Sequence, residues 1–385
     1  MNILYLITFY RVGDGTSAGV YSQIDVDKSV CDDYLVVTKE IKSAQEGLNI
    51  VTNAQKKVIC NFIKKGDLVV HFFRGHFSNL LLEMLQLTGN NIPVIITVCQ
   101  SPSYKNLWLT PFELKHAWQI VFIDKAAYNN RIIRFIPDRS KMQIYLTGKK
   151  NIHHYNDIHK IDNNTNIVFG RGSTSIKCPK NMFEVFDKIE IPNKLFRIVG
   201  IEGDSWIRDE AAKRDNVEVY GQLPLCEWEE VCNSFDVFLY QLPKDCYASL
   251  DGTLGLAMML KKPVVYMGCE APKERFRHAI NGFVANTVEE MAHYATLLGK
   301  DENLRKKIGE AGRESCINDF KYEERVEKYQ EVYKRLTIYR PYKIPISYVI
   351  QFFFNNKQES QIYLKGKFRE WFPIFFRFYK KIKNG

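Results

Sequence analysis

The chain has 385 residues, of which 45% are hydrophobic and 25% charged. These proportions exclude a disordered protein, and the length fits two domains of ordinary size plus an extension. The net charge is +10, but ten Lys and Arg residues against two Glu residues between 338 and 385 supply +8 of it. The rest of the chain is nearly neutral, so we expect no nucleic-acid partner.

The sequence gives no sign of a targeting or membrane-spanning segment. Met1 leads directly into an apolar run at 2–9, without the basic region and cleavage site of a signal peptide. No run approaches the roughly 20 apolar residues needed to cross a bilayer. The nine cysteines form neither a C-x-x-C pair nor a zinc spacing. We therefore expect a cytoplasmic protein with reduced thiols.

Short apolar runs alternate with helical patterns along the first part of the chain. Strands alternating with helices predict a doubly wound α/β domain over residues 1–150. The predicted strands are 2–9, 34–37, 67–71, 93–98 and 119–123, with helices at 78–88 and 124–134.

A polar segment, 151–165, is typical of an interdomain linker. A second alternation follows and predicts a second α/β domain over 166–320. Its predicted strands are 166–169, 196–199, 217–219, 237–240, 263–265 and 282–284. Its predicted helices lie near 180–189, 205–213, 227–233, 253–261, 288–298 and 302–317.

The turn from Asp251 to Thr253 is the most informative feature of the second half, because it precedes a short apolar helix and a Pro-led strand. A turn at a helix N-terminus presents free N–H groups and a positive dipole end, which suits a phosphate. The alternative is an ordinary helix cap, since Asp and Thr favour that position. Strand, turn, helix and strand in this order favour the ligand edge of a nucleotide-binding domain.

Two other turns carry candidate ligand contacts. Gly170-Arg171 ends the first predicted strand of the second half, and Arg171 with Lys177 could balance the charge of a diphosphate. The alternative is a tight turn with two solvated cations.

Near the N-terminus, residues 13–19 could form a flexible glycine loop over a ligand, or a surface turn with a capping Asp or Ser. Its G-x-G-x-x-x-G spacing is one residue longer than the dinucleotide fingerprint, which disfavours a nicotinamide enzyme.

Together these pieces resemble the GT-B glycosyltransferases, and most closely the retaining group 1 (family 4) class, over about residues 1–335. The matching pieces are the loop 13–19, Gly170-Arg171 with Lys177, and the segments 197–200, 216–222, 235–240, 257–265, 301–312 and 322–336. The resemblance implies two Rossmann-like, doubly wound domains facing a cleft, and a helix at 321–337 that returns to the first domain.

The resemblance also implies transfer of a sugar from a nucleotide-sugar donor, without a metal or another cofactor. The donor would lie mostly on the second domain and the acceptor on the first. Arg171 and Lys177 would stabilise the leaving diphosphate as its charge develops. The donor-binding positions would be Gly13, Asp14, Gly15, Thr16, Gly170, Gln222, Leu223, Gly252, Thr253 and Leu254. Among them, the backbone at Gln222 and Leu223 would hold the base.

The sequence departs from the family at its carboxylates. The family usually carries two glutamates eight residues apart around this turn, and these positions hold Ala248 and Leu256 here. In the resemblance, Asp251 or Asp245 would take the place of the carboxylate that binds the sugar.

A second departure concerns the usual histidine of the first domain. Its position corresponds to about Cys99, beside Gln100, and the nearest other polar candidates are His76 and Arg74. Two alternatives therefore stay open. One is a GT-B-shaped binding or scaffold subunit without catalysis, and the other is an inverting GT-B enzyme of another family that uses a first-domain base.

The last segment, 338–385, is basic and holds fourteen aromatic residues. Apolar side chains recur at three- and four-residue spacing at Phe368, Trp371, Phe372, Phe375, Phe376, Tyr379 and Ile382. This pattern predicts an amphipathic helical tail on an anionic membrane surface, on the inner face of the cell membrane. The alternative is that the stripe packs back on the first domain. A membrane location fits a glycan or lipid-linked acceptor in surface polysaccharide or glycolipid synthesis.

Overall fold

A computed structural model describes the protein from residue 1 to residue 355, with gaps. Residues outside the description are 13, 76–77, 90, 101–108, 131–132, 134–138, 146–164, 171–176, 202–204, 222, 224–226, 228–229, 232–233, 247, 250–251, 320, 337–343 and 356–385.

The first half is built on a seven-stranded parallel sheet in the order β3-β2-β1-β4-β5-β6-β7. Its strands are β1 (Asn2–Tyr10), β2 (Asp33–Ile41), β3 (Ile50–Thr52), β4 (Leu68–Arg74), β5 (Val94–Val98), β6 (Gln119–Phe122) and β7 (Met142–Ile144). The helices are α1 (Gly15–Asp27), α2 (Lys56–Ile63), α3 (Leu80–Thr88), α4 (Pro111–His116) and α5 (Lys125–Tyr128).

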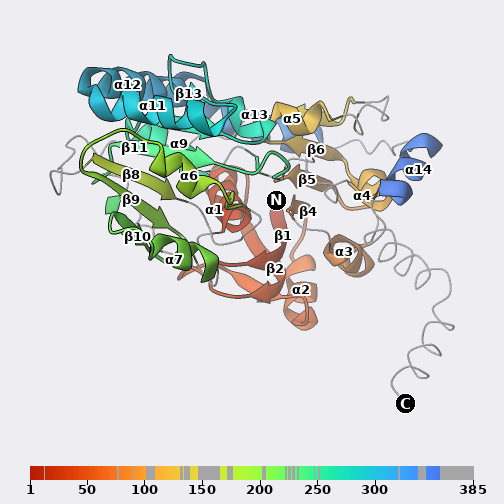
Figure 1. Cartoon of the computed structure of the whole chain (residues 1–385). Coiled ribbons are helices and arrows are strands. Elements are labelled where there is room, and N and C mark those ends of the chain that lie inside the picture. Colours follow the sequence, from red (N-terminus) through yellow and green to blue (C-terminus); the bar gives the residue numbers. More distant parts are fainter. Residues whose placement is uncertain are drawn as a thin grey trace.

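The second half is built on a six-stranded parallel sheet in the order β10-β9-β8-β11-β12-β13. Its strands are β8 (Thr165–Gly170), β9 (Lys194–Val199), β10 (Val217–Val219), β11 (Val237–Gln241), β12 (Val264–Met267) and β13 (Phe283–Val284). The helices are α6 (Met182–Asp187), α7 (Ser205–Ala211), α9 (Gly252–Met259), α10 (Glu270–Lys273), α11 (Val288–Lys300) and α12 (Glu302–Asp319). Figure 1 shows the two halves side by side.

Both faces of each sheet are buried, as parallel sheets require. In β1, Leu4 and Leu6 belong to one core cluster, whereas Ile3, Tyr5 and Ile7 belong to the cluster on the opposite face. The second sheet divides its strands between two clusters in the same way. The prediction of two doubly wound α/β domains is confirmed.

The chain returns to the first half through α13 (Tyr322–Arg335), which packs against α1. A buried polar network fixes this helix. Asp27 of α1 accepts hydrogen bonds from the hydroxyls of Tyr5 (2.6 Å) and Tyr333 (2.7 Å), and Arg325 donates to Gln23 (2.7 Å). Burial raises the pKa of Asp27 to about 6, while the hydrogen bonds it accepts oppose this rise.

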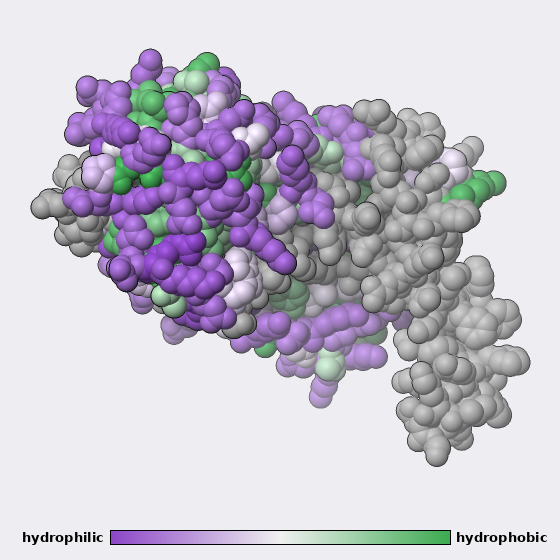
Figure 2. Space-filling view, in the orientation of Figure 1, coloured by the Kyte–Doolittle hydropathy of each residue, from purple (hydrophilic) through white to green (hydrophobic). Residues whose placement is uncertain are grey.

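The last described helix, α14 (Ile346–Asn355), also packs on the first half. Tyr348 and Phe352 are fully buried in its core, and the Tyr348 hydroxyl donates to the carbonyl of Leu109 (2.5 Å). Burying side chains of this size stabilises a fold by roughly 1.5–3 kcal/mol each. The opposite side of α14 exposes Ile346 and Ile350, and Figure 2 shows an apolar patch there.

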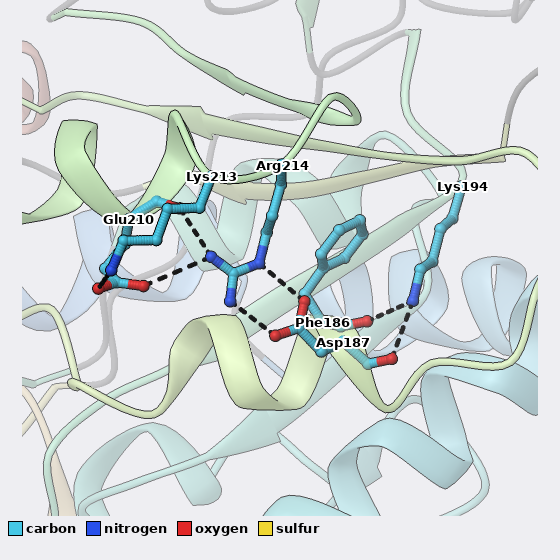
Figure 3. Close-up of polar contacts among 6 residues, drawn as sticks. All are labelled: Phe186, Asp187, Lys194, Glu210, Lys213 and Arg214. Carbon is cyan, nitrogen blue, oxygen red and sulfur yellow. Dashed lines mark hydrogen bonds and ion pairs between the residues drawn. The ribbon is translucent and has the colours of Figure 1, made fainter.

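A surface network joins α6, β9 and α7 (Figure 3). Arg214 donates from Nε and Nη2 to the two carboxylate oxygens of Asp187 (2.8 and 2.7 Å), and from Nη1 to the carbonyl of Glu210. The Lys194 ammonium caps the end of α6 by donating to the carbonyls of Phe186 and Ile189 (2.7 Å each). These contacts join the end of α6 to β9 and to the residues that follow α7.

Two predictions of local structure are wrong. The helix predicted over 124–134 ends at Tyr128, where α5 stops after four residues. The predicted loop over 13–19 is helical from Gly15 onward, because Asp14 caps α1. The cap by Asp that the alternative interpretation expects is present, while the ligand contacts predicted for this segment stay predictions.

Candidate functional site at the carboxyl edges of the two sheets

The order of strands marks one ligand position in each sheet. The direction of winding reverses between β1 and β4 in the first sheet and between β8 and β11 in the second. Ligands of open α/β sheets bind outside the carboxyl ends of the strands at such a reversal. The segments that follow these four strands therefore form the candidate site.

In the second sheet, two predicted pieces meet this criterion. Gly170 is the last residue of β8, and Arg171, the next residue along the chain, lies outside the described residues. The connection after β11 leads to Gly252, the first residue of α9. Gly170 and the start of α9 therefore belong to the carboxyl ends of the two strands on either side of the reversal.

Helix α9 is held rigidly, which fixes the direction of its first N–H groups. From Leu254 to Met259 every side chain is buried, so the helix is enclosed on all sides. Its C-terminal end is closed by Arg313 of α12, whose Nη1 donates to the carbonyl of Met259 (2.6 Å). Gly252 stays exposed and Thr253 partly exposed. The exposed end of this helix can therefore present N–H groups to an anion.

Other predicted donor residues have separate environments. Lys177 is partly exposed and precedes α6. Leu223 is partly buried against the core around α9, just beyond β10. Gly13, His76, Arg171, Gln222 and Asp251 lie outside the described residues, so their predictions stay predictions.

In the first sheet, the predicted loop after β1 is occupied by its own cap. The Asp14 carboxylate accepts hydrogen bonds from the backbone N–H groups of Thr16 (2.9 Å) and Ser17 (3.1 Å). These are the N–H groups that an anion would use at the start of α1. A phosphate is disfavoured here because the carboxylate already fills that role and repels negative charge.

The connections after β1 and β4 touch each other. A Cβ placed on Gly75 would lie 2.9 Å from Thr16 Oγ1, which is closer than real side chains approach. Only glycine fits at this position without a shift of Thr16. The two segments of the first-half site therefore form one continuous surface.

The two sheets meet at these carboxyl edges. Ser249, in the connection after β11, donates its hydroxyl proton to the carbonyl of Cys99, the residue after β5 (3.0 Å). Burial, together with the charge of Asp14, raises the pKa of the Cys99 thiol to about 12. The raised pKa favours the protonated thiol over the thiolate, which is the nucleophilic form.

Arg74, one of the polar candidates after β4, has a structural role. Its side chain is 1% exposed, and Nε lies 3.4 Å from the carboxylate of Glu113, which is 3% exposed. Glu113 also completes a capping box with Thr110 at the start of α4. The pair anchors α4 to the end of β4.

The positions of the missing glutamates are apolar in structure as well as in sequence. Ala248 and Leu256 are 4% and 6% exposed and pack in the core cluster around α9.

No three His, Cys, Asp or Glu side chains within the described part of the chain gather in a way that could hold a metal ion. None of the described helices is both long and apolar enough to cross a membrane.

Two facing Rossmann-like domains of this kind, with a last helix returning to the first, define the GT-B class, and this chain has that fold. Residues 154–315 match the family model of the glycosyl transferases group 1. The matched segment contains both second-half pieces of the candidate site. Family match and fold together support a GT-B glycosyltransferase.

Solved structures with the same fold are only distantly related in sequence. A glycosyltransferase from Rickettsia africae is 17% identical, with a TM-score of 0.65 over 87% of this chain and 98% of its own. HepE of Anabaena, in complex with UDP-glucose, is 13% identical, with a TM-score of 0.67 over 87% and 99%. WaaG, a glycosyltransferase involved in lipopolysaccharide biosynthesis, is 14% identical, with a TM-score of 0.62 over 86% and 99%. No curated protein sequence matches this chain.

Proposed function

We propose that the protein transfers a sugar from a nucleotide-sugar donor to a glycan or lipid-linked acceptor. The observation that carries the proposal is that Gly170, at the end of β8, and the exposed start of α9, after β11, both lie at the strand-order reversal of the second sheet. The group 1 family match over 154–315 and the UDP-glucose bound by HepE support this type of donor.

In this proposal the donor diphosphate lies between two sources of positive potential. Arg171 and Lys177 balance its charge from one side, and the N–H groups of Gly252, Thr253 and Leu254 bind it from the other. Both sources act most strongly as the diphosphate leaves and gains charge, so they lower the barrier without a metal or another cofactor. Backbone at Gln222 and Leu223 holds the base. Asp251 contacts the sugar.

The first half supplies the acceptor side. Asp14 excludes phosphate from the start of α1 but can accept hydrogen bonds from hydroxyl groups, which an acceptor sugar carries. His76 is the proposed acid–base group there. The basic aromatic tail holds the enzyme on the anionic inner face of the cell membrane, which fits surface polysaccharide or glycolipid synthesis, the type of process in which WaaG is involved.

A second candidate function is a GT-B-shaped binding or scaffold subunit without catalysis. The apolar residues Ala248 and Leu256, both packed in the core, favour it, because they stand where the group 1 resemblance places two glutamates. An inverting mechanism with a first-domain base is the corresponding option among active enzymes.

Incubation of the purified full-length protein with a panel of UDP-, GDP- and other nucleotide sugars separates these functions. We expect turnover of at least one donor, by transfer or by slow hydrolysis, that persists in EDTA. Nucleotide binding without turnover of any donor would favour the scaffold. The anomeric configuration of a product would decide between retention and inversion.

A further inference from the structure

A carboxylate from the second half is bound by backbone N–H groups of the first half. Glu274 follows α10, and its two carboxylate oxygens accept from the N–H groups of Lys125 (2.9 Å) and Ala126 (2.6 Å). These two residues begin α5, directly after β6. Hydrogen bonds from two donors to one ionised group are among the stronger ones in proteins. The contact joins residues almost 150 positions apart.

The charges around Glu274 favour the bound, ionised form. Lys125 and Arg275 carry positive charge next to it, and on α10 the charges of Glu270 and Lys273 pair with each other (2.7 Å). Burial raises the pKa of Glu274, while its two backbone hydrogen bonds oppose that rise. The neighbouring carboxyl of Asp124 is fully buried, and its pKa rises to about 7 through burial and through the charge of Glu274. Of the two adjacent acids, Glu274 therefore carries the negative charge more readily.

A cavity of about 540 Å³ lies along the same contact. The first half contributes Lys125, Asn129 and Asn130 to its wall, and the second half contributes Glu270, Lys273 and Glu274. Because its walls come from both halves, the cavity keeps its shape only while they are held together. The Ser249 to Cys99 bond is a second, separate connection between the halves.

We propose that Glu274 is a positioning residue that clasps the two halves through α5 and so sets the width of the cleft between the carboxyl edges of the sheets. It acts on the reaction through the arrangement of the domains and does not touch the reacting atoms. The clasp itself is independent of the proposed function. Only its effect on donor kinetics rests on that function.

The test compares E274Q and E274A with E270Q in the full-length protein. Glutamine keeps the size of the side chain, but its NH₂ group cannot accept from the second N–H group. E270Q is the matched control, because Glu270 lies on α10 beside the same cavity and does not bond to α5. Amide hydrogen exchange reports on the N–H groups of Lys125 and Ala126, and small-angle X-ray scattering reports on the separation of the halves.

We expect both Glu274 variants to exchange these two amides at least tenfold faster and to have a larger radius of gyration, with E270Q like the wild type. With a turned-over donor, the KM should rise several-fold while kcat changes little. Unchanged exchange of the Lys125 and Ala126 amides in E274Q would overturn the clasp. Faster exchange of these amides at an unchanged radius of gyration would also overturn it, because Glu274 would then only cap the start of α5. Absence of donor turnover by the wild type would contradict the proposed function. Amide exchange and X-ray scattering would still test the clasp in that case, because neither measurement needs a donor.

Discussion

Asp14 shows how a single side chain selects the kind of ligand its surroundings can bind. The two N–H groups at the start of α1 already donate to its carboxylate, so this helix end carries no free positive potential. At the start of α9 in the second half, Gly252 is exposed, and Asp251, the residue before it, lies outside the described residues. In our proposal the charged donor lies on the second half and the hydroxyl-bearing acceptor on the first.

Replacing Asp14 by alanine should destabilise the protein by about 1 kcal/mol, because the first turn of α1 loses its cap. Asparagine, which also caps helices, should retain most of the stability. Urea denaturation of D14A and D14N against the wild type measures the difference. Equal unfolding midpoints for D14A and the wild type would show that the cap contributes nothing.

Asp124 should make stability depend on pH. Burial raises its pKa from 3.8 to about 7 in the folded protein, so the native state holds a proton that the unfolded chain has already released. The contribution of this carboxyl to stability is therefore fully present below about pH 4 and is lost as the pH rises to 7. D124N should gain stability relative to the wild type over this range, by more than about 1 kcal/mol. A stability difference that does not vary between pH 4 and pH 8 would contradict the assignment.

Among the elements, the long central strands are predictable from sequence and the connections between them are less so. β4 and β5 are mostly apolar and are buried over their whole length, as is typical of a parallel sheet between helices. The start of α1 was not predicted, because Gly13 and Gly15 indicate a loop and the cap by Asp14 overrides them. The sequence has no signal for the Ser249 to Cys99 bond, which depends on how two separate domains dock.

Two ion pairs should differ in how much they contribute to the free energy of unfolding. Arg74 and Glu113 are both buried, so R74M leaves an uncompensated carboxylate and should cost about 3–5 kcal/mol. Arg214 and Asp187 are 20% and 50% exposed, so R214M should cost less than about 1 kcal/mol. Thermal or urea unfolding of the two variants gives the comparison. Equal losses would show that burial does not decide the strength of these pairs.

The whole molecule combines a nearly neutral body with a basic end. Residues after 355 carry eight Lys and Arg residues against two Glu residues, directly after α14 and its exposed Ile346 and Ile350. Each basic residue near an anionic bilayer contributes about 1 kcal/mol to binding. In the sequence, this basic segment follows a helix that packs on the half that we propose binds the acceptor.

Deleting residues 356–385 should abolish binding to vesicles that contain anionic lipid and leave the body folded, since α14 and its buried Tyr348 and Phe352 remain. Vesicle co-sedimentation with and without anionic lipid measures this, and neutral vesicles are the control. If the truncated protein binds anionic vesicles as well as the full chain does, the tail is not the anchor.

The proposed donor site requires the diphosphate to lie beside Lys177 and Arg171 in the second half. With a donor that the wild type turns over, K177A and R171A should each lower kcat/KM by at least about 100-fold, which corresponds to roughly 2.7 kcal/mol of transition-state stabilisation. K180A is the matched control, because Lys180 is an exposed lysine only three residues further along the chain. Its kinetics should stay within a factor of about two of the wild type, since a solvated cation away from the phosphates contributes little. Unchanged kinetics in both K177A and R171A would contradict the donor site.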